Sequence, residues 1–213
     1  MNQEIHLNEP FGQNIYNIIR EFDLRKNLEI GSWDGDGSTR CFVEAMRTLT
    51  GPKKLECIEI IPEKYKILCD RFPDDFIQCI NQSSISYDDL VYKEFDQIWY
   101  SPFNKTRKQY TYDMVKSWFD RDIETIKQSS SYITSDTTEY DSVLIDGGEF
   151  TGYSEYLLLK DKVKIFFLDD VHQAFKCYQI YDELNKSVDW ELLAENPNIR
   201  NGYAIFKKKG FYE

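Results

Sequence analysis

Short apolar runs alternate with amphipathic stretches along most of this chain. Apolar runs bounded by turn residues are typical of buried strands, and apolar positions recurring every three to four residues are typical of helices. The helices predicted in this way cover 11–20, a segment that starts at Ser38 and stops at Gly51-Pro52, a segment opened by Pro62, and 173–185. The predicted strands cover 28–30, 55–60, 76–80, 142–146, 163–168, 190–193 and 203–207.

The order of these elements predicts the fold class. Strands that alternate with helices form mostly parallel sheets with helices on both faces. The last two strands are instead separated by turn formers, Asn196-Pro197-Asn198 and Asn201-Gly202, and are expected to pair antiparallel. We therefore predict one α/β domain over residues 1–213, with a Rossmann-like, doubly wound, seven-stranded sheet that is mostly parallel and has an antiparallel C-terminal strand.

The regular pattern is lost between residues 83 and 139. This segment is polar and aromatic, and it closes in a Ser/Thr-rich run at 129–138. A connection this long should contain helices of its own, because long structureless loops are rare in compact domains. The stretch 95–100 is apolar enough to be a strand, and a place in the main sheet stays open for it.

A glycine-rich stretch follows the first predicted strand. It reads Glu29-Ile30-Gly31-Ser32-Trp33-Asp34-Gly35-Asp36-Gly37-Ser38. Glycines let the backbone turn sharply and approach a ligand, and Ser38 is a good N-cap for a helix that presents free N–H groups. Glu59, near the end of the next strand, can accept hydrogen bonds from both hydroxyls of a ribose. The sequence thus predicts a nucleoside-binding loop.

Two classes of nucleotide cofactor compete for such a loop. The dinucleotide pattern G-x-G-x-x-G would require glycine at Arg40 if it began at Gly35. Asp34 and Asp36 would also repel a pyrophosphate, whereas a sulfonium and an ammonium group would tolerate them. The spacing favours S-adenosylmethionine over a nicotinamide dinucleotide, and a tight turn without a ligand is the third alternative.

Two acidic groups follow neighbouring strands. Asp146-Gly147-Gly148-Glu149 comes after one strand, and Asp169-Asp170-Val171-His172 comes after the next. Ligands bind at the carboxyl ends of parallel strands, so both groups should face the same crevice as the glycine loop. Three carboxylates there repel one another unless a proton or a cation joins them, and oxygen ligands suit Mg²⁺, Mn²⁺ or Ca²⁺. Such a metal would lower the pKa of a substrate hydroxyl. Alternatively, Asp169 and Asp170 cap the helix over 173–185, and 146–148 is a plain turn.

The motif E-I-G-S-x-x-G-x-G-S, a strand ending in Ile58-Glu59-Ile60 and a later Leu144-Ile145-Asp146-Gly147 resemble the class I S-adenosylmethionine-dependent methyltransferases. The chain is most similar to the small-molecule O-methyltransferases that include macrocin-type sugar enzymes, over roughly 26–84 and 140–208. This resemblance implies that Glu29, Gly31 and Ser32 lie along the methionine part and that Glu59 binds the ribose. It also places Ser83 and Ser84 near the adenine, and Gly35, Gly37, Ser38 and Ile60 complete the expected cofactor site.

The resemblance also implies roles for the acidic groups. In the similar sugar enzymes these positions hold a metal, and here they are Asp146, Asp169 and Asp170. Many relatives read I-D-G-D-H where this chain has Gly148-Glu149, so the usual histidine is replaced by a glutamate. The expected catalytic residues are Glu149 or His172 as the base, together with Asp146.

The composition changes the picture in three ways. A net charge of −11 argues against nucleic acid, because phosphate binding needs clustered Lys and Arg. No signal peptide or membrane-spanning run is evident, so we expect a cytoplasmic protein. Five scattered cysteines without a CxxC pair are expected to be reduced.

We therefore predict a methyltransferase that uses S-adenosylmethionine, with Mg²⁺ or Mn²⁺, to methylate a hydroxyl of a small acceptor such as a sugar or glycan precursor. A metal-independent N- or O-methyltransferase and a non-catalytic cofactor-binding protein are the alternatives. The resemblance implies that 85–139 is an insertion that recognises the acceptor; its aromatic residues equally suit a satellite core or a dimer contact. The sequence leaves the oligomeric state open, a homo-oligomer included.

Overall fold

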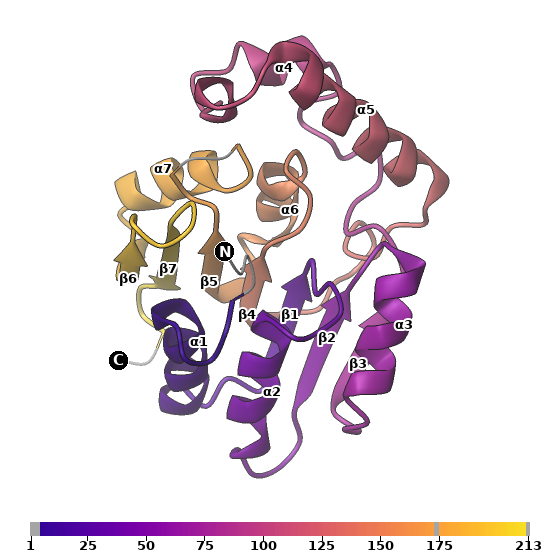
Figure 1. Ribbon diagram of the computed structural model, residues 1–213. Helices are drawn as coiled ribbons and strands as arrows, with labels where there is room; N and C mark the ends of the chain where they lie inside the picture. Colours follow the sequence, from indigo (N-terminus) through magenta and orange to yellow (C-terminus); the bar gives the residue numbers. More distant parts are fainter. Residues whose placement is uncertain (1–4, 173–174, 212–213) are drawn as a thin grey trace.

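Seven strands form one sheet in the computed structural model, which describes residues 5–172 and 175–211 (Figure 1). The strand order is β3-β2-β1-β4-β5-β7-β6. The first five strands pair in parallel, and β7 pairs antiparallel with both β5 and β6. This confirms the predicted doubly wound sheet. The strands are β1 (Lys26–Ile30), β2 (Lys54–Ile58), β3 (Ile77–Ile80), β4 (Tyr140–Ile145), β5 (Val163–Asp169), β6 (Trp190–Asn196) and β7 (Tyr203–Lys208).

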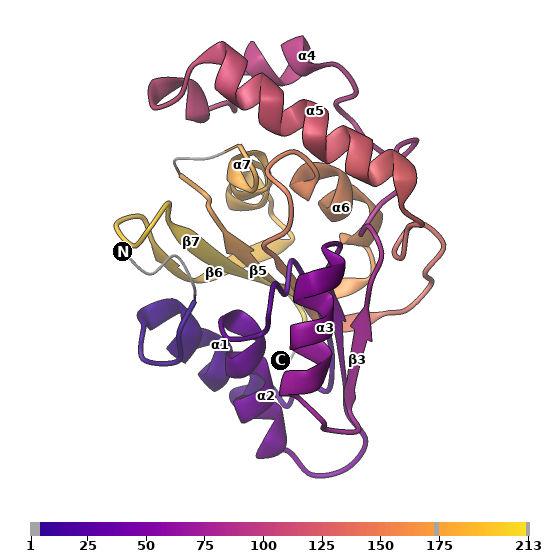
Figure 2. The ribbon, with the colours of Figure 1, turned by 45° about the vertical axis from the view of Figure 1, so that its right-hand side comes forward.

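Helices cover both faces of the sheet (Figure 2). A hydrophobic cluster lies beneath each layer. Side chains alternate between the two faces along a strand. In β5, Phe166 and Leu168 join one cluster, whereas Ile165 and Phe167 join the other. One layer consists of α1 (Pro10–Glu21), α2 (Ser38–Arg47) and α3 (Pro62–Arg71), and the other includes α6 (Gly152–Leu159) and α7 (Tyr178–Lys186).

The segment between β3 and β4 is mainly helical. It forms α4 (Phe95–Trp99), the short 3₁₀ helix η1 (Thr106–Lys108) and α5 (Tyr112–Gln128). The two views show α4 and α5 beyond α6 and α7, on the side to which the parallel strands point (Figures 1 and 2). The suggestion that 95–100 is a strand was wrong. Phe95 and Ile98 are buried at helical spacing, and Glu94 with Gln97 forms a capping box that begins a helix.

Two predicted helix starts also differ from the structure. Helix α2 has Gly37 at its N-cap, so Ser38 is its first residue and its hydroxyl does not cap it. The helix predicted over 173–185 begins at Tyr178, after Cys177 at the N-cap, and residues 173 and 174 lie outside the described part. Asp169 and Asp170 are therefore not its caps, which removes that alternative for the two carboxylates.

No helix within the described part of the chain is long and apolar enough to cross a membrane.

Candidate cofactor and catalytic site

The loop after β1 is held in a narrow space by two glycines. Gly31 has φ +89°, and a Cβ there would lie 2.3 Å from the backbone oxygen of Asp146. Gly35 has φ +81°, and a Cβ there would lie 2.8 Å from Leu68 and from Phe72. Both positions therefore require glycine for two reasons, a left-handed backbone and close approach. The contact with Asp146 places the glycine loop directly beside the first acidic group.

Trp33 lies within this loop in a strained conformation. Its φ is +50°, a backbone conformation that tryptophan rarely adopts. Residues in such conformations cluster at functional sites. Its indole is 42% exposed, and the Lys64 ammonium lies 4.1 Å from the ring centroid. Its backbone N–H is directed inward and donates to Glu59 over 2.8 Å. The loop thus holds an open aromatic ring above a buried carboxylate.

Glu59 lies just beyond β2 and is only 4% exposed. Its two oxygens each accept one backbone N–H, from Trp33 and from Ile61, both over 2.8 Å. Burial raises the pKa of Glu59, and these hydrogen bonds oppose the rise. Asn81 anchors the same turn from β3 by donating to the backbone oxygens of Glu59 and Ile60. The backbone N–H of Ile60 also acts on this carboxylate. Because a carboxylate has about four lone-pair positions, acceptor capacity remains for a further donor.

Glu29 is fully buried and is used within the protein. Its oxygens accept hydrogen bonds from Ser38 over 2.5 Å and from Thr39 over 2.6 Å. Burial raises its pKa, and the two hydroxyls oppose that rise. The neighbouring Ser32 is also buried, and its backbone N–H donates to the oxygen of Ile58. Glu29 therefore joins β1 to the start of α2 beneath the loop.

The two serines expected near the adenine are also engaged internally. Ser83 and Ser84 are both buried. The hydroxyl of Ser83 donates to the backbone oxygen of Ile85 over 2.7 Å, and that of Ser84 donates to Glu155 on α6 over 2.5 Å. Their contact with an adenine stays a prediction.

The acids within the glycine loop are paired with helix cations. Asp34 lies 3.4 Å from the Lys64 ammonium, and Asp36 lies 2.7 Å from Arg40. Arg71 contacts both side chains and also donates to the backbone oxygen of Asp34. Their charges are therefore balanced by α2 and α3, which weakens the sequence argument that they accompany a sulfonium.

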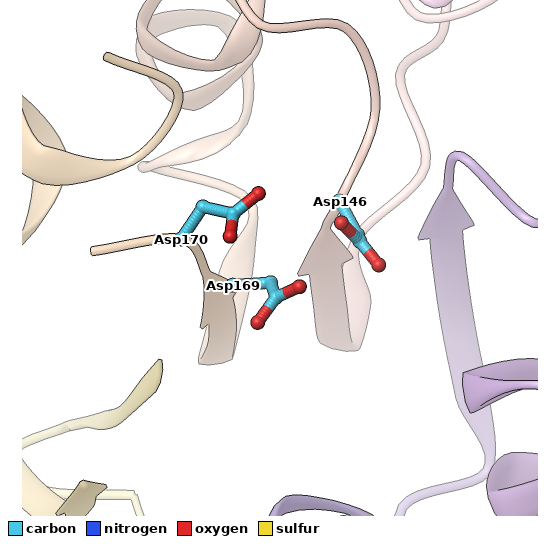
Figure 3. Close-up of side chains that lie close together, drawn as sticks. All are labelled: Asp146, Asp169 and Asp170. Atoms are coloured by element: carbon cyan, nitrogen blue, oxygen red, sulfur yellow. The ribbon is translucent and has the colours of Figure 1, made fainter. Parts of the chain in front are cut away.

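The carboxylates that follow β4 and β5 lie together, as the sequence predicts, and form one acidic cluster. Asp146 follows β4, Asp169 ends β5 and Asp170 follows it (Figure 3). One oxygen from each carboxylate lies within 4.8 Å of the others. Asp170 has φ +57°, a conformation that aspartate tolerates better than most residues. The parallel sheet thus brings three carboxylates to one point.

Two basic side chains already occupy this acidic cluster. The Lys176 ammonium lies 2.8 Å from Asp146 and 2.7 Å from Asp170. Arg200, from the β6–β7 turn, lies 2.6 Å from Asp169. Sequence reasoning missed both residues. No motif marks them, because each is brought to the cluster by the path of a loop.

The pKa values of Asp169 and Asp170 shift in opposite directions. Burial, reinforced by the neighbouring carboxylates, raises the pKa of Asp169 despite Arg200. Burial also acts to raise the pKa of Asp170, but Lys176 and a 2.9 Å hydrogen bond from Asn201 outweigh it and lower the value. Burial disfavours the charged form of Lys176, yet the surrounding carboxylates raise its pKa well above the usual value. The cluster is an internal ion-pair network.

Glu149, one of the two predicted bases, lies beside the segment that carries Lys176. Its Oε1 accepts the backbone N–H of Phe175 over 2.6 Å. Burial raises its pKa to about 7, and the Lys176 ammonium opposes the rise. A pKa near the working pH is favourable for proton transfer, because the group is ionised yet still basic.

His172 is the other predicted base, and its ring is enclosed. It packs edge-on against Tyr181 with centroids 5.0 Å apart, and a Cβ at Gly202 would lie 2.4 Å from its Cδ2. Its Nε2 is buried without a hydrogen-bond partner among the described residues. Which of the two residues acts as a base stays a prediction.

The comparisons with known proteins bear on the fold. No family model and no curated protein matches the sequence. The fold, however, is similar to that of solved O-methyltransferases. TomG from Streptomyces achromogenes, solved with S-adenosylmethionine, has a TM-score of 0.56 at 13% identity, over 94% of this chain and 80% of its own.

Two further structures agree. An O-methyltransferase from Bacillus cereus, in complex with S-adenosylhomocysteine, has a TM-score of 0.55 at 12% identity, over 94% of this chain and 82% of its own. The methyltransferase PaMTH1 from Podospora anserina, also bound to S-adenosylhomocysteine, has a TM-score of 0.54 at 15% identity, over 93% and 77%. This chain has the fold of the S-adenosylmethionine-dependent O-methyltransferases.

Proposed function

We propose that this protein is an S-adenosylmethionine-dependent methyltransferase that acts on a hydroxyl of a small acceptor, such as a sugar or glycan precursor. The observation that carries this proposal is the position of Glu59. Its carboxylate lies beneath the glycine loop at the carboxyl edge of the sheet, where open α/β sheets bind ligands. Neighbours of the same fold, TomG among them, were solved with S-adenosylmethionine or its product.

The residues around the loop suit this cofactor. Glu59 would accept the ribose hydroxyls, and Gly31 and Gly35 let the loop pack against Asp146, Leu68 and Phe72 beside that carboxylate. S-adenosylmethionine would supply an electrophilic methyl group on its sulfonium. The proposed cofactor site comprises Glu29, Gly31, Ser32, Gly35, Gly37, Ser38, Glu59, Ile60, Ser83 and Ser84.

Glu149 would act as the general base on the acceptor. It lies close enough to the acidic cluster for Lys176 to influence its pKa, and α5 packs over the same loop. The cofactor would supply the methyl group to the acceptor oxygen and leave as the thioether, and Glu149 would accept the proton of the acceptor hydroxyl. The products are a methyl ether and S-adenosylhomocysteine.

The sequence predicts a metal ion at the acidic cluster. The oxygen donors suit such an ion, but basic side chains already contact them. Asp146, Asp169 and Asp170 offer the oxygens that Mg²⁺ or Mn²⁺ prefers. However, Lys176 and Arg200 contact all three carboxylates. The residues present therefore do not fit a metal ion bound at these carboxylates.

Residues 85–139, which include α4 and α5, are the proposed acceptor-recognition segment. Aromatic residues of this segment contact the loops that carry the site: Phe119 lies 5.4 Å from Phe150, and Tyr92 lies 5.5 Å from Phe175, between ring centroids. Tyr92 also donates to Gln179 over 2.7 Å. Contact with the loops after β4 and β5 supports a role in shaping the acceptor pocket.

Thermal unfolding in the presence of S-adenosylmethionine, S-adenosylhomocysteine and NAD tests the cofactor. A ligand at 100 times its dissociation constant stabilises the folded state by about 2.7 kcal/mol, a readable shift. We expect both adenosyl ligands to raise Tm and NAD to leave it unchanged. A response to NAD alone would refute the proposal. Methyl transfer to a panel of sugars and phenols, measured as S-adenosylhomocysteine release, then tests turnover.

A further inference from the structure

We propose that Lys176 takes the place of a divalent cation in the Asp146–Asp169–Asp170 cluster, so that this protein binds no Mg²⁺ or Mn²⁺ there. The Lys176 ammonium bridges Asp146 and Asp170 at 2.8 and 2.7 Å. Arg200 neutralises the third carboxylate. These three carboxylates are the only group of metal-ligand type that comes together within the described residues.

The main chain around Lys176 is held firmly, so the bridge is not the contact of a loose surface lysine. A Cβ at Gly152 would lie 2.5 Å from the backbone oxygen of Lys176, which shows how closely this segment abuts α6. On either side, the N–H of Phe175 donates to Glu149 and the thiol of Cys177 donates to the backbone oxygen of Ile145. The lysine side chain is 11% exposed.

A divalent ion and this ammonium would compete for the same oxygens. Mg²⁺ and Ca²⁺ bind carboxylate oxygens at about 2.0–2.6 Å, so an ion on Asp146 and Asp170 would lie against the ammonium. The like charges would repel in a site that offers little water for screening. The ion could bind there only if the Lys176 side chain left both carboxylates, which would break two ion pairs.

The ammonium can supply one function of a metal ion, which is fixed positive charge beside the acceptor. Lysine has three N–H donors, and the two carboxylates take two of them. The third can hold the acceptor oxygen as its proton leaves. This part of the inference rests on the proposed function, whereas the absence of metal binding does not.

Binding of Mn²⁺ alone, followed by the loss of its free electron paramagnetic resonance signal, tests the proposal on the full chain. We expect the wild type to bind Mn²⁺ no more tightly than a millimolar dissociation constant. Lys176→Ala, which frees the carboxylates, should bind at least tenfold more tightly, and adding Asp170→Asn should remove the gain. Lys164→Ala is the matched control, because it breaks a 2.7 Å ion pair with Asp141 elsewhere in the sheet and should leave Mn²⁺ binding unchanged.

Equal Mn²⁺ affinity in the wild type and in Lys176→Ala, whether tight or immeasurable, would overturn the proposal. Lys176→Gln, which keeps most of the stem, is used if the alanine variant does not fold. The Tm of either variant should fall and should rise again with Mn²⁺, whereas the Tm of the wild type should not respond. A wild-type Tm that rises with micromolar Mn²⁺ and falls with EDTA would also overturn it.

The activity measurement separates this inference from the proposed function. Methyl transfer by the wild type should be unchanged after dialysis against EDTA. Full activity that requires added Mg²⁺ would overturn the role of Lys176 while leaving the methyltransferase in place. Absence of any Tm shift with S-adenosylmethionine would instead count against the proposed function and leave the Mn²⁺ result standing.

Discussion

Two neighbouring parts of the site stabilise their carboxylates with different partners, neutral hydrogen-bond donors in one and basic side chains in the other. Beneath the glycine loop, Glu29 and Glu59 accept hydrogen bonds from hydroxyls and backbone N–H groups, with no cation in direct contact among the described ion pairs. Beyond β4 and β5, the aspartates are held by Lys176 and Arg200. The first arrangement leaves acceptor capacity for a neutral ligand, whereas the second is closed by charge within the chain.

Carboxylates alone therefore do not identify a metal centre. Three acids at one edge of a sheet look the same in a sequence whether a metal or a lysine joins them. The basic partner decides the chemistry, and it comes from a segment with no recognisable spacing. Hydrogen-bonded acids, in contrast, can be inferred from the loop motif that surrounds them.

The largest expected effect concerns Glu149, the proposed general base. Glu149→Gln should lower turnover about 10²–10⁴-fold, the usual contribution of a general base. Because burial raises the pKa of Glu149 to about 7, the wild-type rate should rise with pH up to about that value, and the variant should lose this limb. The measurement is a pH–rate profile, with the S-adenosylmethionine affinity as the control. A variant that keeps the wild-type profile would transfer the role of base to another group.

The same carboxyl should affect stability with a defined sign. The pKa of Glu149 is raised from 4.5 to about 7, so the folded state holds a proton that the unfolded state has already lost between these values. The free energy of unfolding should therefore fall as the pH rises across this window. Glu149→Gln should flatten that slope, as followed by urea unfolding at several pH values. An unchanged slope would show that other groups produce it.

Glu59→Ala should weaken S-adenosylmethionine binding about 100-fold, since it removes two hydrogen bonds to a charged group worth about 1.5 kcal/mol each. Asp169→Ala should spare most of the affinity, because its partner is Arg200. Glu63→Ala, at an exposed position of α3, is the matched control. Calorimetric titration decides. If Asp169→Ala weakened binding as strongly as Glu59→Ala, the two groups of acids would not be separate in function.

Thr39→Val tests how much the hydrogen bond to Glu29 contributes to the stability of the fold. It removes the 2.6 Å hydrogen bond to the buried Glu29, so the free energy of unfolding should fall by about 1.5–3 kcal/mol. Thr50→Val, at an exposed position, should change it by less than about 0.5 kcal/mol. Equal stability of the two variants would mean that Glu29 is held by other contacts.

The smallest expected effect concerns the exposed acids of the loop. Asp36→Ala removes ion pairs with Arg40 and Arg71, in which the side chains of Asp36, Arg40 and Arg71 are 50%, 43% and 29% exposed. Exposed pairs are worth about 0–1 kcal/mol, so urea unfolding should detect little change. A loss comparable to that of Thr39→Val would show that the charge pairing at the loop surface matters as much as the buried bonds.

The sequence allowed the sheet and the meeting of the three aspartates to be predicted, because both follow from short-range patterns. Apolar runs define strands, and parallel strands bring their carboxyl ends together. Residues 95–100 are ambiguous in the sequence, because a short apolar run suits a strand or a helix. The Glu94–Gln97 capping box is the signal that indicates the helix. Lys176 and Arg200 could not be predicted, because their positions depend on how two loops fold back over the sheet.

The contact between Gly31 and the backbone of Asp146 has a consequence for redesign. The two strand ends touch through main chain, without an intervening side chain that could be exchanged. The spacing between the glycine loop and the acidic cluster is therefore set by this main-chain contact. Selection for new acceptors should therefore accumulate substitutions in α4 and α5, and libraries that randomise position 31 should return glycine alone.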